Sequence, residues 1–307
     1  MNNKKNIILL GATGSIGDSS LRLLRKNKEK FNLIGVSAHD NVELLSNIVN
    51  EFDVPNVVLS NPKNAKSYFG KYELNVGQSC LIELAKISCD VVISGIIGMS
   101  GLYPAFAAIS VGNNLAIANK ETLVSAGKIF MEKSHEKKVK IFPVDSEHNA
   151  IFQCLEKNNF SNINSITLTA SGGPFLNTPL ENFKNIKPKD AIKHPVWKMG
   201  EKISVDSATM FNKALEIIEA SVLFNISCDK IDVTIHPEHI IHGLVHYKDG
   251  SILANLGFPD MITPLSVAIN WPTRLNLNLK KLSLHKIGNL SFFEPNFEKF
   301  PALKLGW

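Results

Sequence analysis

The chain has 307 residues, of which 44% are hydrophobic and 20% are charged, and its formal net charge is +5. This composition excludes a mainly disordered protein, and no apolar run approaches the roughly 20 residues that a membrane-spanning helix needs. The lysines are spread along the chain, so the charge fits anionic small molecules better than nucleic acid. At roughly 150 residues per domain, the length predicts about two domains.

The first predicted element is a strand at residues 6–10. Met1-Asn-Asn-Lys-Lys5 and the apolar residues after it imitate the opening of a signal peptide. The apolar stretch is short, however, and it runs straight into Gly11-Ala-Thr-Gly-Ser-Ile-Gly17 without a sequence typical of cleavage. We therefore predict that the protein stays in the cytoplasm.

Up to about residue 150, short apolar runs alternate with amphipathic stretches. Strands are expected at 6–10, 32–37, 56–59, 90–94, 115–118 and 140–143, and helices at 19–27, 42–51, 103–109 and 122–133. This alternation is typical of a parallel sheet with helices on both faces. We therefore predict an α/β protein whose residues 1–150 form a Rossmann-like domain.

After about residue 160 the pattern changes to α+β. A strand at 166–170 leads into Ser171-Gly-Gly-Pro174, and one long helix is expected at 208–224. Strands at 239–247 and 251–257 flank Lys248-Asp-Gly250, which is a favourable hairpin turn. We assign residues 151–275 to a catalytic domain. Residues 276–307 are then a linker and the start of a further helix with Pro301 in its first turn.

The four cysteines are far apart and form no Cys-x-x-Cys pair. A zinc site or a disulfide framework is therefore not expected, and buried thiols are the better interpretation. The residues concerned are Cys80, Cys89, Cys154 and Cys228.

A glycine pattern, Gly11-x-x-Gly14-x-x-Gly17, lies between the first strand and the first helix. Glycines there let the backbone approach a pyrophosphate, and the helix N-terminus offers free N–H groups. We favour a dinucleotide, with contacts from Thr13, Ser15 and Ile16, over a tight turn without a ligand.

NADP is favoured over NAD at this site. The second strand ends near Ser37-Ala38-His39 without an acid at its tip, where an NAD enzyme holds the ribose hydroxyl. Asp40 follows one or two residues later and leaves NAD open. His39 could face a 2′-phosphate or be an exposed loop residue.

Asp145-Ser-Glu147 follows a strand, and in extended backbone both carboxylates would point the same way and reach one hard cation. Glu216 is the candidate third ligand. It lies on the predicted helix, for which Asp206 or Ser207 would be the N-cap. Asn212, Lys213 and Glu216 are three or four residues apart and would lie on one face of that helix. The alternatives are solvent-facing acids and an ordinary amphipathic helix with a surface Lys–Glu pair.

Ser207, Asn212 and Lys213 would form a phosphate clamp on this helix. Two loops are expected to face a ligand: Ser171-Gly-Gly-Pro174 suits an anion, and His194–Gly200 is a flap that could exclude water. A metal site at the histidines 236, 239, 242 and 246 is not favoured, because their spacing along a turn and a strand does not put them on one face.

Taken together, these segments resemble the 1-deoxy-D-xylulose 5-phosphate reductoisomerase family over essentially the whole chain. The combination is specific although each piece alone is weak. The matching motifs are Gly11-Ala-Thr-Gly-Ser-Ile-Gly, Asn119-Lys-Glu, Pro143-Val-Asp-Ser-Glu-His-Asn-Ala, Ala170-Ser-Gly-Gly-Pro-Phe, His194-Pro-x-Trp-x-Met-Gly, Val205-Asp-Ser-Ala-Thr-Met-x-Asn-Lys-Ala-Leu-Glu, His236-Pro-Glu-His and Trp271-Pro.

The resemblance implies a role for each matching residue. The divalent cation, Mg²⁺ or a similar ion such as Mn²⁺ or Co²⁺, would be held by Asp145, Glu147 and Glu216. The substrate would be contacted by Lys120, Ser146, Ser171, His194, Trp197, Ser207, Asn212, Lys213 and Glu216. The NADPH site would be lined by Thr13, Gly14, Ser15, Ile16, Asn41, Asn119, Glu121, Met199 and Gly200. Catalysis would rest on Lys120, His194 and the three acids.

The resemblance implies that the enzyme is a homodimer and that its reaction has two stages. The cation polarises the substrate ketone and a neighbouring hydroxyl, a carbon–carbon bond is broken and remade to give a branched aldehyde, and NADPH reduces the aldehyde to 2-C-methyl-D-erythritol 4-phosphate. This reaction belongs to non-mevalonate isoprenoid biosynthesis.

The sequence departs from the family in two places. The family often has glycine followed by a basic or small residue near His39-Asp40. It also continues past Leu303-Lys-Leu305 into a C-terminal helical domain that this chain lacks. We therefore expect stability or turnover to suffer.

Two competing functions are open. A semialdehyde dehydrogenase shares a similar glycine loop but needs a nucleophilic cysteine beside a base, and no cysteine lies in such a loop. A non-catalytic NADPH-binding module of the same fold, inactive through truncation, would bind NADPH without cation-dependent turnover.

Overall fold

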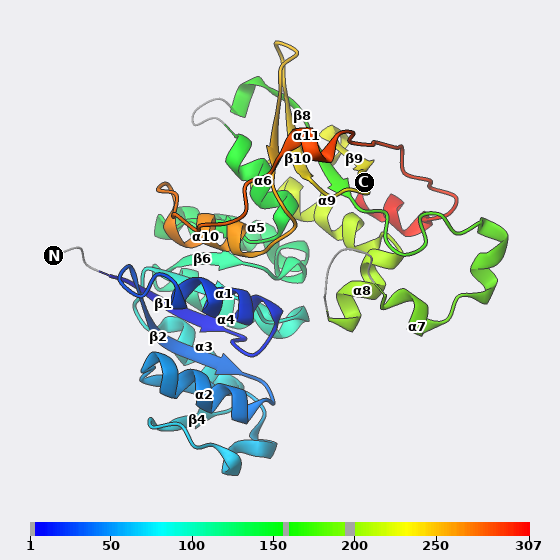
Figure 1. Ribbon diagram of the computed structural model, residues 1–307. Helices are drawn as coiled ribbons and strands as arrows, with labels where there is room; N and C mark the ends of the chain where they lie inside the picture. Colours follow the sequence, from blue (N-terminus) through cyan, green and yellow to red (C-terminus); the bar gives the residue numbers. More distant parts are fainter. Residues whose placement is uncertain (1–3, 156–159, 194–199) are drawn as a thin grey trace. The chain divides into compact units, whose positions relative to one another are not determined.

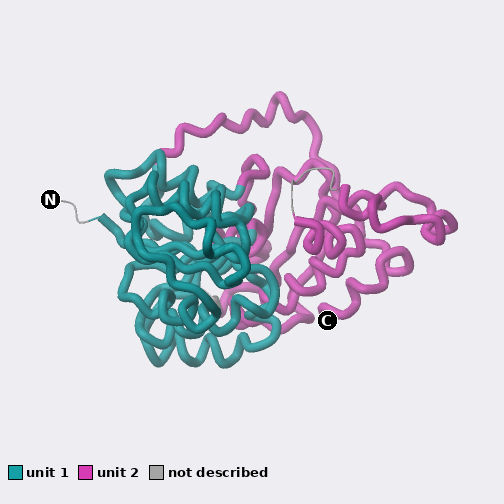
Figure 2. The backbone as a smooth tube through the Cα atoms, turned by 90° about the horizontal axis from the view of Figure 1, so that it is seen from below, with its two compact units in different colours: residues 1–145, 261–275 teal, residues 146–260, 276–307 magenta. Residues whose placement is uncertain are grey.

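The computed structural model describes residues 4–155, 160–193 and 200–307. The chain forms two compact units, each of two segments (Figure 2). Unit 1 comprises the chain up to Asp145 and residues Met261–Leu275, and unit 2 comprises Ser146–Asp260 and Asn276–Trp307. The predicted boundary at 150 lies close to this division. The predicted domain at 151–275 differs from it, because its last fifteen residues belong to unit 1.

Unit 1 contains a seven-stranded sheet in which all neighbouring strands are parallel (Figure 1). The order is β4-β3-β2-β1-β5-β6-β7. The strands are β1 Lys5–Leu10, β2 Phe31–Ala38, β3 Asn56–Leu59, β4 Leu74–Val76, β5 Val91–Ser94, β6 Asn114–Ile117 and β7 Ile141–Pro143. The α/β prediction is confirmed. Of the seven strands only β4 was not predicted, because Leu74-Asn-Val76 is a half-buried edge strand without a continuous apolar run.

Helices follow the strands in the alternation that the sequence predicts. They are α1 Ser15–Arg25, α2 Val42–Phe52, α3 Gln78–Lys86, α4 Leu102–Ser110 and α5 Lys120–Lys137, with short 3₁₀ helices at Pro62–Ser67 (η1) and Gly98–Gly101 (η2). α1 begins four residues earlier than predicted, because Gly14 of the glycine loop is its N-cap. α3 was not predicted.

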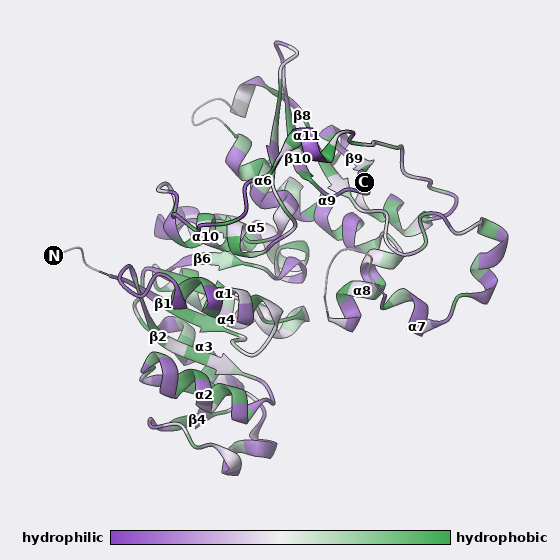
Figure 3. Ribbon diagram, viewed as in Figure 1, coloured by the Kyte–Doolittle hydropathy of each residue, from purple (hydrophilic) through white to green (hydrophobic). Residues whose placement is uncertain are grey.

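The strands of this sheet are buried on both faces, which explains their continuous apolar sequence. Ile7, Ile8, Leu9 and Leu10 are all fully buried. Figure 3 shows the hydrophobic colour on the strands of unit 1 and hydrophilic colour on the outer sides of its helices. α10 (Ile262–Asn270) contributes to this cover, since it packs against α1, β6 and β7.

Unit 2 contains a four-stranded mixed sheet in the order β11-β10-β8-β9. β8 (Ile163–Ala170) pairs parallel with β9 (Ile231–Ile235) and antiparallel with β10 (Ile241–Tyr247), which pairs antiparallel with β11 (Ile252–Leu256). The predicted β10–β11 hairpin is confirmed: the Tyr247 N–H donates to the Ser251 carbonyl at 2.9 Å.

The helices of unit 2 include α6 (Ser146–Cys154) and α9 (Phe211–Phe224), which pack on this sheet around a core that includes Ile166, Leu168, Ile217 and Val245. The unit also contains α7 Pro188–Ala191, α8 Glu201–Ala208 and α11 Leu284–Ile287, with 3₁₀ helices η3 Phe160–Asn162, η4 Leu180–Asn185, η5 Cys228–Lys230 and η6 Pro301–Gly306. Leu303 of η6 is fully buried, so the predicted turn of helix there packs into the core.

The long helix predicted at 208–224 is present as α9, but it begins three residues later than predicted. The chain ends α8 at Ala208 and starts α9 at Phe211, with Met210 in the left-handed conformation (φ 60°) between them. Asp206 and Ser207 therefore lie in the last turn of α8 and do not cap α9. The break accompanies burial of Met210, which is only 2% exposed in the core. Such a conformation costs about 1–3 kcal/mol for a residue other than glycine.

Among the described residues, no helix is long and apolar enough to cross a membrane.

Candidate active site

Two glycines of the loop between β1 and α1 are required by the fold itself. Gly11 has a φ of 81°, and a Cβ there would lie 2.9 Å from the Gly95 carbonyl oxygen. A Cβ on Gly17 would lie 2.2 Å from the Ala12 carbonyl oxygen. Both clashes involve backbone atoms of unit 1, so these glycines do not by themselves indicate a ligand.

Gly14 differs from the other two glycines. Its φ is −89°, and a Cβ there would meet nothing closer than the Gly11 oxygen at 3.5 Å, which is ordinary contact. Other residues would therefore fit this backbone. The absent side chain leaves open the N-terminus of α1, where free N–H groups favour an anion. This position favours a phosphate-binding loop over a tight turn without a ligand.

The other predicted cofactor residues of unit 1 follow the carboxyl ends of its strands, where open α/β sheets bind ligands. Asn41 follows β2 and caps α2, accepting from the Leu44 N–H at 3.0 Å. Asn119 follows β6 and caps α5, accepting from the Thr122 N–H at 3.1 Å and donating to the Gly98 carbonyl at 2.7 Å. Their side chains shape these loops. The remaining predicted residues at this edge are Thr13, Ser15 and Ile16 after β1, and Glu121 in the first turn of α5.

Lys120 and Asp145 form a buried ion pair in unit 1. The Lys120 Nζ lies 2.9 Å from Asp145 Oδ2, and the two side chains are 7% and 13% exposed. Lys120 is the first residue of α5, and Asp145 follows β7 by two residues, so both lie after strand ends. Two sequence-predicted residues that are 25 positions apart are thus brought together.

In unit 2, α6 and α9 bring together acids that are almost seventy positions apart. The Lys213 Nζ lies 2.9 Å from Glu147 Oε1 and also contacts Glu216 Oε2. Asn212 donates to the other oxygen of Glu216, and the Ser146 hydroxyl donates to Glu147. Asn212, Lys213 and Glu216 share one face of α9, as their spacing predicts.

The local backbone at Glu147 differs from the prediction. The sequence predicted extended backbone from Asp145 to Glu147, whereas Glu147 lies in the first turn of α6. Its carboxylate is therefore directed by a helix. The positive end of the α6 dipole favours negative charge at this turn.

Asp145 is the last residue of the first segment of unit 1, and one peptide bond joins it to Ser146, so the chain itself holds Asp145 next to α6. One carboxylate oxygen each from Asp145, Glu147 and Glu216 lie within 4.8 Å of one another. Two buried carboxylates and a half-buried one at this spacing repel each other and are costly without nearby cations. The ammonium groups of Lys120 and Lys213 offset this cost.

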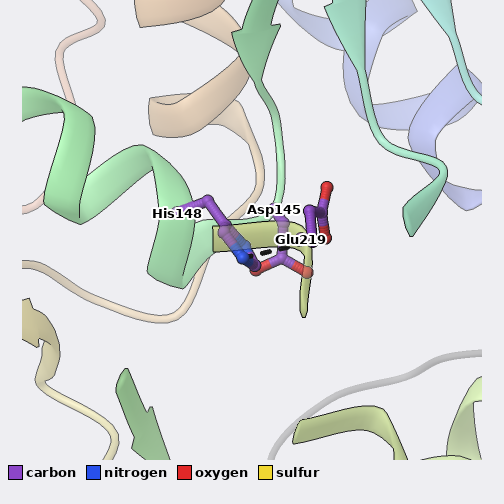
Figure 4. A group of neighbouring side chains, drawn as sticks. All are labelled: Asp145, His148 and Glu219. Atoms are coloured by element: carbon purple, nitrogen blue, oxygen red, sulfur yellow. Dashed lines mark ion pairs between the residues drawn. The ribbon is translucent and has the colours of Figure 1, made fainter. Parts of the chain in front are cut away.

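His148 and Glu219 also lie at this site, although neither was predicted from the sequence. Both are buried, and the His148 Nε2 lies 3.8 Å from Glu219 Oε2 (Figure 4). The same nitrogen lies 2.9 Å from the Glu216 carbonyl oxygen. His148 and Glu219 therefore hold α6 against α9 beside Glu147 and Glu216. The sequence offered one indication of their role, because His148 directly follows Glu147 and Glu219 comes three residues after Glu216.

Two predicted phosphate-binding segments of unit 2 lie side by side. A Cβ on Gly173 would lie 3.0 Å from the Ser207 carbonyl oxygen, so the Ser171–Pro174 loop contacts the end of α8. The Ser171 hydroxyl accepts from the Gly173 N–H at 3.4 Å. Within the described residues the buried Oδ1 of Asn212 has no hydrogen-bond partner, which leaves an acceptor for a ligand hydroxyl.

Of the predicted flap, only Gly200 is among the described residues, and it caps α8. His194, Trp197 and Met199 lie outside the described residues.

The histidines of the 236–246 segment have structural partners. His236 is fully buried and accepts from the Ile240 and Ile241 N–H groups at 3.1 and 3.2 Å. The His242 Nε2 lies 3.2 Å from the Gly257 oxygen, and the His246 Nε2 lies 2.8 Å from the Thr167 hydroxyl. These contacts stabilise the turn and the sheet of unit 2.

The cysteines of this chain are all free thiols. Only Cys154 is buried, and the other three are half-buried, so the prediction of buried thiols is wrong for those three. Burial raises the pKa of the Cys89 thiol to about 12, which makes it a poor nucleophile.

Family profiles match three parts of the chain. The profile "1-deoxy-D-xylulose 5-phosphate reductoisomerase" matches residues 7–127. The profile for the C-terminal domain of that enzyme matches 141–224, and "DXP reductoisomerase C-terminal domain" matches 256–307. The chain is also 44% identical over 311 residues to the reductoisomerase of Clostridium novyi, a match that covers 99% of this chain and 81% of that protein. The chain belongs to this family.

The reductoisomerase of Prosthecochloris aestuarii is likewise 44% identical over 310 residues, with the same coverage of 99% and 81%. Among solved structures, the Zymomonas mobilis reductoisomerase in complex with NADPH matches with a TM-score of 0.93, 39% identity, 99% of this chain and 80% of that chain. A reductoisomerase in complex with NADPH, fosmidomycin and magnesium has a TM-score of 0.93 and 38% identity, covering 98% of this chain and 78% of that chain. The predicted family is confirmed, and the semialdehyde dehydrogenase alternative is not supported.

Proposed function

We propose that this chain is an NADPH- and divalent-metal-dependent oxidoreductase that converts 1-deoxy-D-xylulose 5-phosphate to 2-C-methyl-D-erythritol 4-phosphate. The observation that carries the proposal is the convergence of Asp145, Glu147 and Glu216, with one oxygen from each within 4.8 Å of the others. Membership of the family supplies the substrate and the product.

The three carboxylates fit a hard divalent cation such as Mg²⁺ or Mn²⁺, which takes oxygen ligands. When bound, the cation would act as a Lewis acid that polarises the ketone and a neighbouring hydroxyl of the substrate. Lys213 bridges Glu147 and Glu216, and its ammonium group contributes the charge balance that lets two acids stay buried together.

The same residues would bind and orient the substrate. Lys213, Asn212 and Ser207 follow one another across the α8–α9 junction and would hold the phosphate end, together with Ser171. Lys120 and Ser146 each contact one of the acids and would orient the ketone end. His194 and Trp197 remain proposed substrate contacts outside the described residues.

NADPH would bind unit 1 through the glycine loop. The open space over Gly14 and the N-terminus of α1 suit its pyrophosphate. Thr13, Ser15, Ile16, Asn41, Asn119 and Glu121 lie at the same edge of the sheet and would complete this site, with Met199 and Gly200 added by the flap.

The direct test is turnover of 1-deoxy-D-xylulose 5-phosphate with NADPH, followed through nicotinamide absorbance. We expect activity with Mg²⁺, none after chelation, and at least about a hundredfold loss in Glu216→Gln. Glu181→Gln, an exposed carboxylate of η4, is the matched control and should keep wild-type activity. Full activity of a folded Glu216→Gln variant would refute the assignment of this acid.

We also propose that the protein forms a homodimer through β11. This strand is an edge of the unit 2 sheet, and Ile252, Leu253, Leu256 and Phe258 are 38–53% exposed on and after it. An exposed apolar edge strand is a template for pairing with a second copy. Light scattering should give twice the chain mass, and Leu253→Lys should give the monomer. A wild-type monomer at high concentration would refute this proposal.

The proposed location is the cytoplasm, where free thiols persist. All four cysteines are free, which supports this location. Fractionation of cells that express the chain with its native N-terminus tests it, because recovery from a secreted fraction would contradict the proposal.

A further inference from the structure

The tips of β2 and β3 carry a small polar network in unit 1. The Asp40 carboxylate accepts from the Asn61 side-chain amide through Oδ1, and its Oδ2 lies 3.6 Å from the His39 Nε2. The other nitrogen of His39, Nδ1, lies 2.8 Å from the Ser60 hydroxyl. Asn61 is itself fixed, since its N–H donates to the His39 carbonyl at 3.2 Å and its Oδ1 accepts from the Lys63 N–H at 3.2 Å.

This network fixes the Asp40 carboxylate at the edge of the sheet where the strands have their carboxyl ends. The Asp40 side chain is 58% exposed, so its carboxylate can meet a ligand, with Oδ2 further than hydrogen-bond distance from His39. Within the described residues it forms no ion pair with a lysine or an arginine, so its negative charge is not neutralised by such a base. Ala12 N–H donates to the Ser37 carbonyl at 2.7 Å, which ties the end of β2 to the glycine loop.

A carboxylate at the tip of the second strand discriminates between the two nicotinamide dinucleotides. It accepts hydrogen bonds from the ribose hydroxyls of NADH, whereas it repels the 2′-phosphate of NADPH. An enzyme selective for NADPH typically has a basic side chain at this position. Here the neighbouring base is His39, which already faces Asp40 and Ser60. Lys63 and Lys66 lie in η1, after β3, and among the described residues neither forms an ion pair with Asp40.

We propose that Asp40, positioned by Asn61, makes this chain accept NADH alongside NADPH. This inference rests on the proposed function, since it concerns the same cofactor site. The residues that follow β2 and β3 would then select the cofactor, independently of the three acids of the cation site. The ribose hydroxyls of NADH would donate to the exposed Asp40 carboxylate, beside His39 and Ser60.

Equilibrium binding tests the proposal without turnover. Isothermal titration of the metal-free, substrate-free protein with NADPH and with NADH gives the two dissociation constants. Titration with 2′,5′-ADP and 5′-AMP isolates the ribose end of each cofactor. We expect a preference for NADPH below about thirtyfold in the wild type, and Asp40→Asn should increase that preference by about fivefold or more.

Glu29→Gln is the matched control, because it removes one exposed carboxylate just before β2, at the opposite end of the strand. It should leave the preference unchanged. Asp40→Lys is the second variant and should increase the preference beyond Asp40→Asn. Since Asp40 is exposed, both variants should fold, and circular dichroism checks this.

A wild-type preference above about thirtyfold would overturn the proposal, and so would an Asp40→Asn variant with an unchanged preference. Either result would leave the proposed function standing, because NADPH would still bind. Failure to bind both dinucleotides would instead refute the proposed function and this inference together.

Discussion

At the residue scale, Lys213 is the most consequential single side chain of the described site. Its side chain is 5% exposed, and its ammonium group joins Glu147 to Glu216, whose side chains are 10% and 1% exposed. Removing one partner of a buried charge cluster leaves the others uncompensated, which is usually worse than replacing the whole cluster by apolar groups. Lys213 therefore serves stability as well as substrate binding.

We expect Lys213→Met to lower the free energy of unfolding by about 3–5 kcal/mol, measured by urea denaturation. Mg²⁺ should restore more stability to this variant than it adds to the wild type, because it would neutralise the same acids. The control is Lys202→Met, whose ion pair with Asp206 involves a lysine that is 48% exposed and should cost less than about 1 kcal/mol. A Lys213→Met variant as stable as this control would contradict the prediction.

Cys89 gives a prediction for alkaline pH. Burial raises the pKa of its thiol from 9.0 to about 12 in the folded protein. Between these values the unfolded chain loses the proton and the folded chain keeps it, so stability falls as pH rises through this window. One group contributes a slope of about 1.4 kcal/mol per pH unit.

Urea denaturation across that window should show a steeper fall of stability in the wild type than in Cys89→Ala, and the two slopes should differ by up to about 1.4 kcal/mol per pH unit. Cys80→Ala should keep the wild-type slope, because Cys89 is still present. Equal slopes in the wild type and in Cys89→Ala would show that the thiol ionises in the folded protein as easily as in the unfolded chain.

At the element scale, the loop between β1 and α1 separates a folding role from a binding role. Gly17→Ala puts a Cβ 2.2 Å from a backbone oxygen, so we expect a loss of about 3 kcal/mol in stability. Gly14→Ala has room, and it should cost less than about 1 kcal/mol because alanine is only a poorer N-cap than glycine.

Gly17→Ala should lose more stability than Gly14→Ala, whereas Gly14→Ala should show the direct loss of NADPH affinity. Gly14→Ala should bind NADPH at least about tenfold more weakly than the wild type while remaining folded, because its Cβ occupies the approach of the pyrophosphate. Titration of NADPH and urea denaturation measure the two effects. Wild-type affinity in Gly14→Ala would mean that no phosphate approaches this backbone.

At the scale of the whole molecule, the return of residues 261–275 to unit 1 has a consequence for stability. α10 buries Ile262, Leu265, Val267 and Ile269, and Lys5 donates to the Ile269 carbonyl at 3.1 Å. The apolar side chains of this helix complete the cover of the parallel sheet. A fragment that ends at Asp145 would lack α10 and would expose to water the part of the sheet that α10 covers.

We expect residues 1–145 joined through a flexible linker to residues 261–275 to be more stable than residues 1–145 alone. Burial of four large apolar side chains at about 1.5–3 kcal/mol each predicts a difference of at least about 5 kcal/mol. Urea denaturation of both fragments measures it. A linked fragment with Leu265→Asp is the control and should lose most of the gain; equal stability of all three would exclude a role for α10.

Much of the fold follows from local patterns. The inner strands of unit 1, such as β1, β3 and β5, are largely buried and each produced an apolar run, and the β10–β11 hairpin was predicted from three turn residues. β4 escaped prediction because it is a half-buried edge strand with Asn75 at its centre, and α3 was also missed. The break at Met210 escaped it because a left-handed residue other than glycine is stabilised by its burial in the core, which no local pattern reports.

The sequence by itself determined the family, the alternation of strands and helices, and the types of residue available for cofactor, cation and phosphate. Only the tertiary structure decided that Glu147 meets Glu216 through Lys213, that Gly14 alone of its loop is free of steric demand, and that α10 belongs with the first sheet. The physical reason is range. Periodicity and turn chemistry act over a few residues, whereas charge pairing and burial join positions that the chain brings together only when it folds.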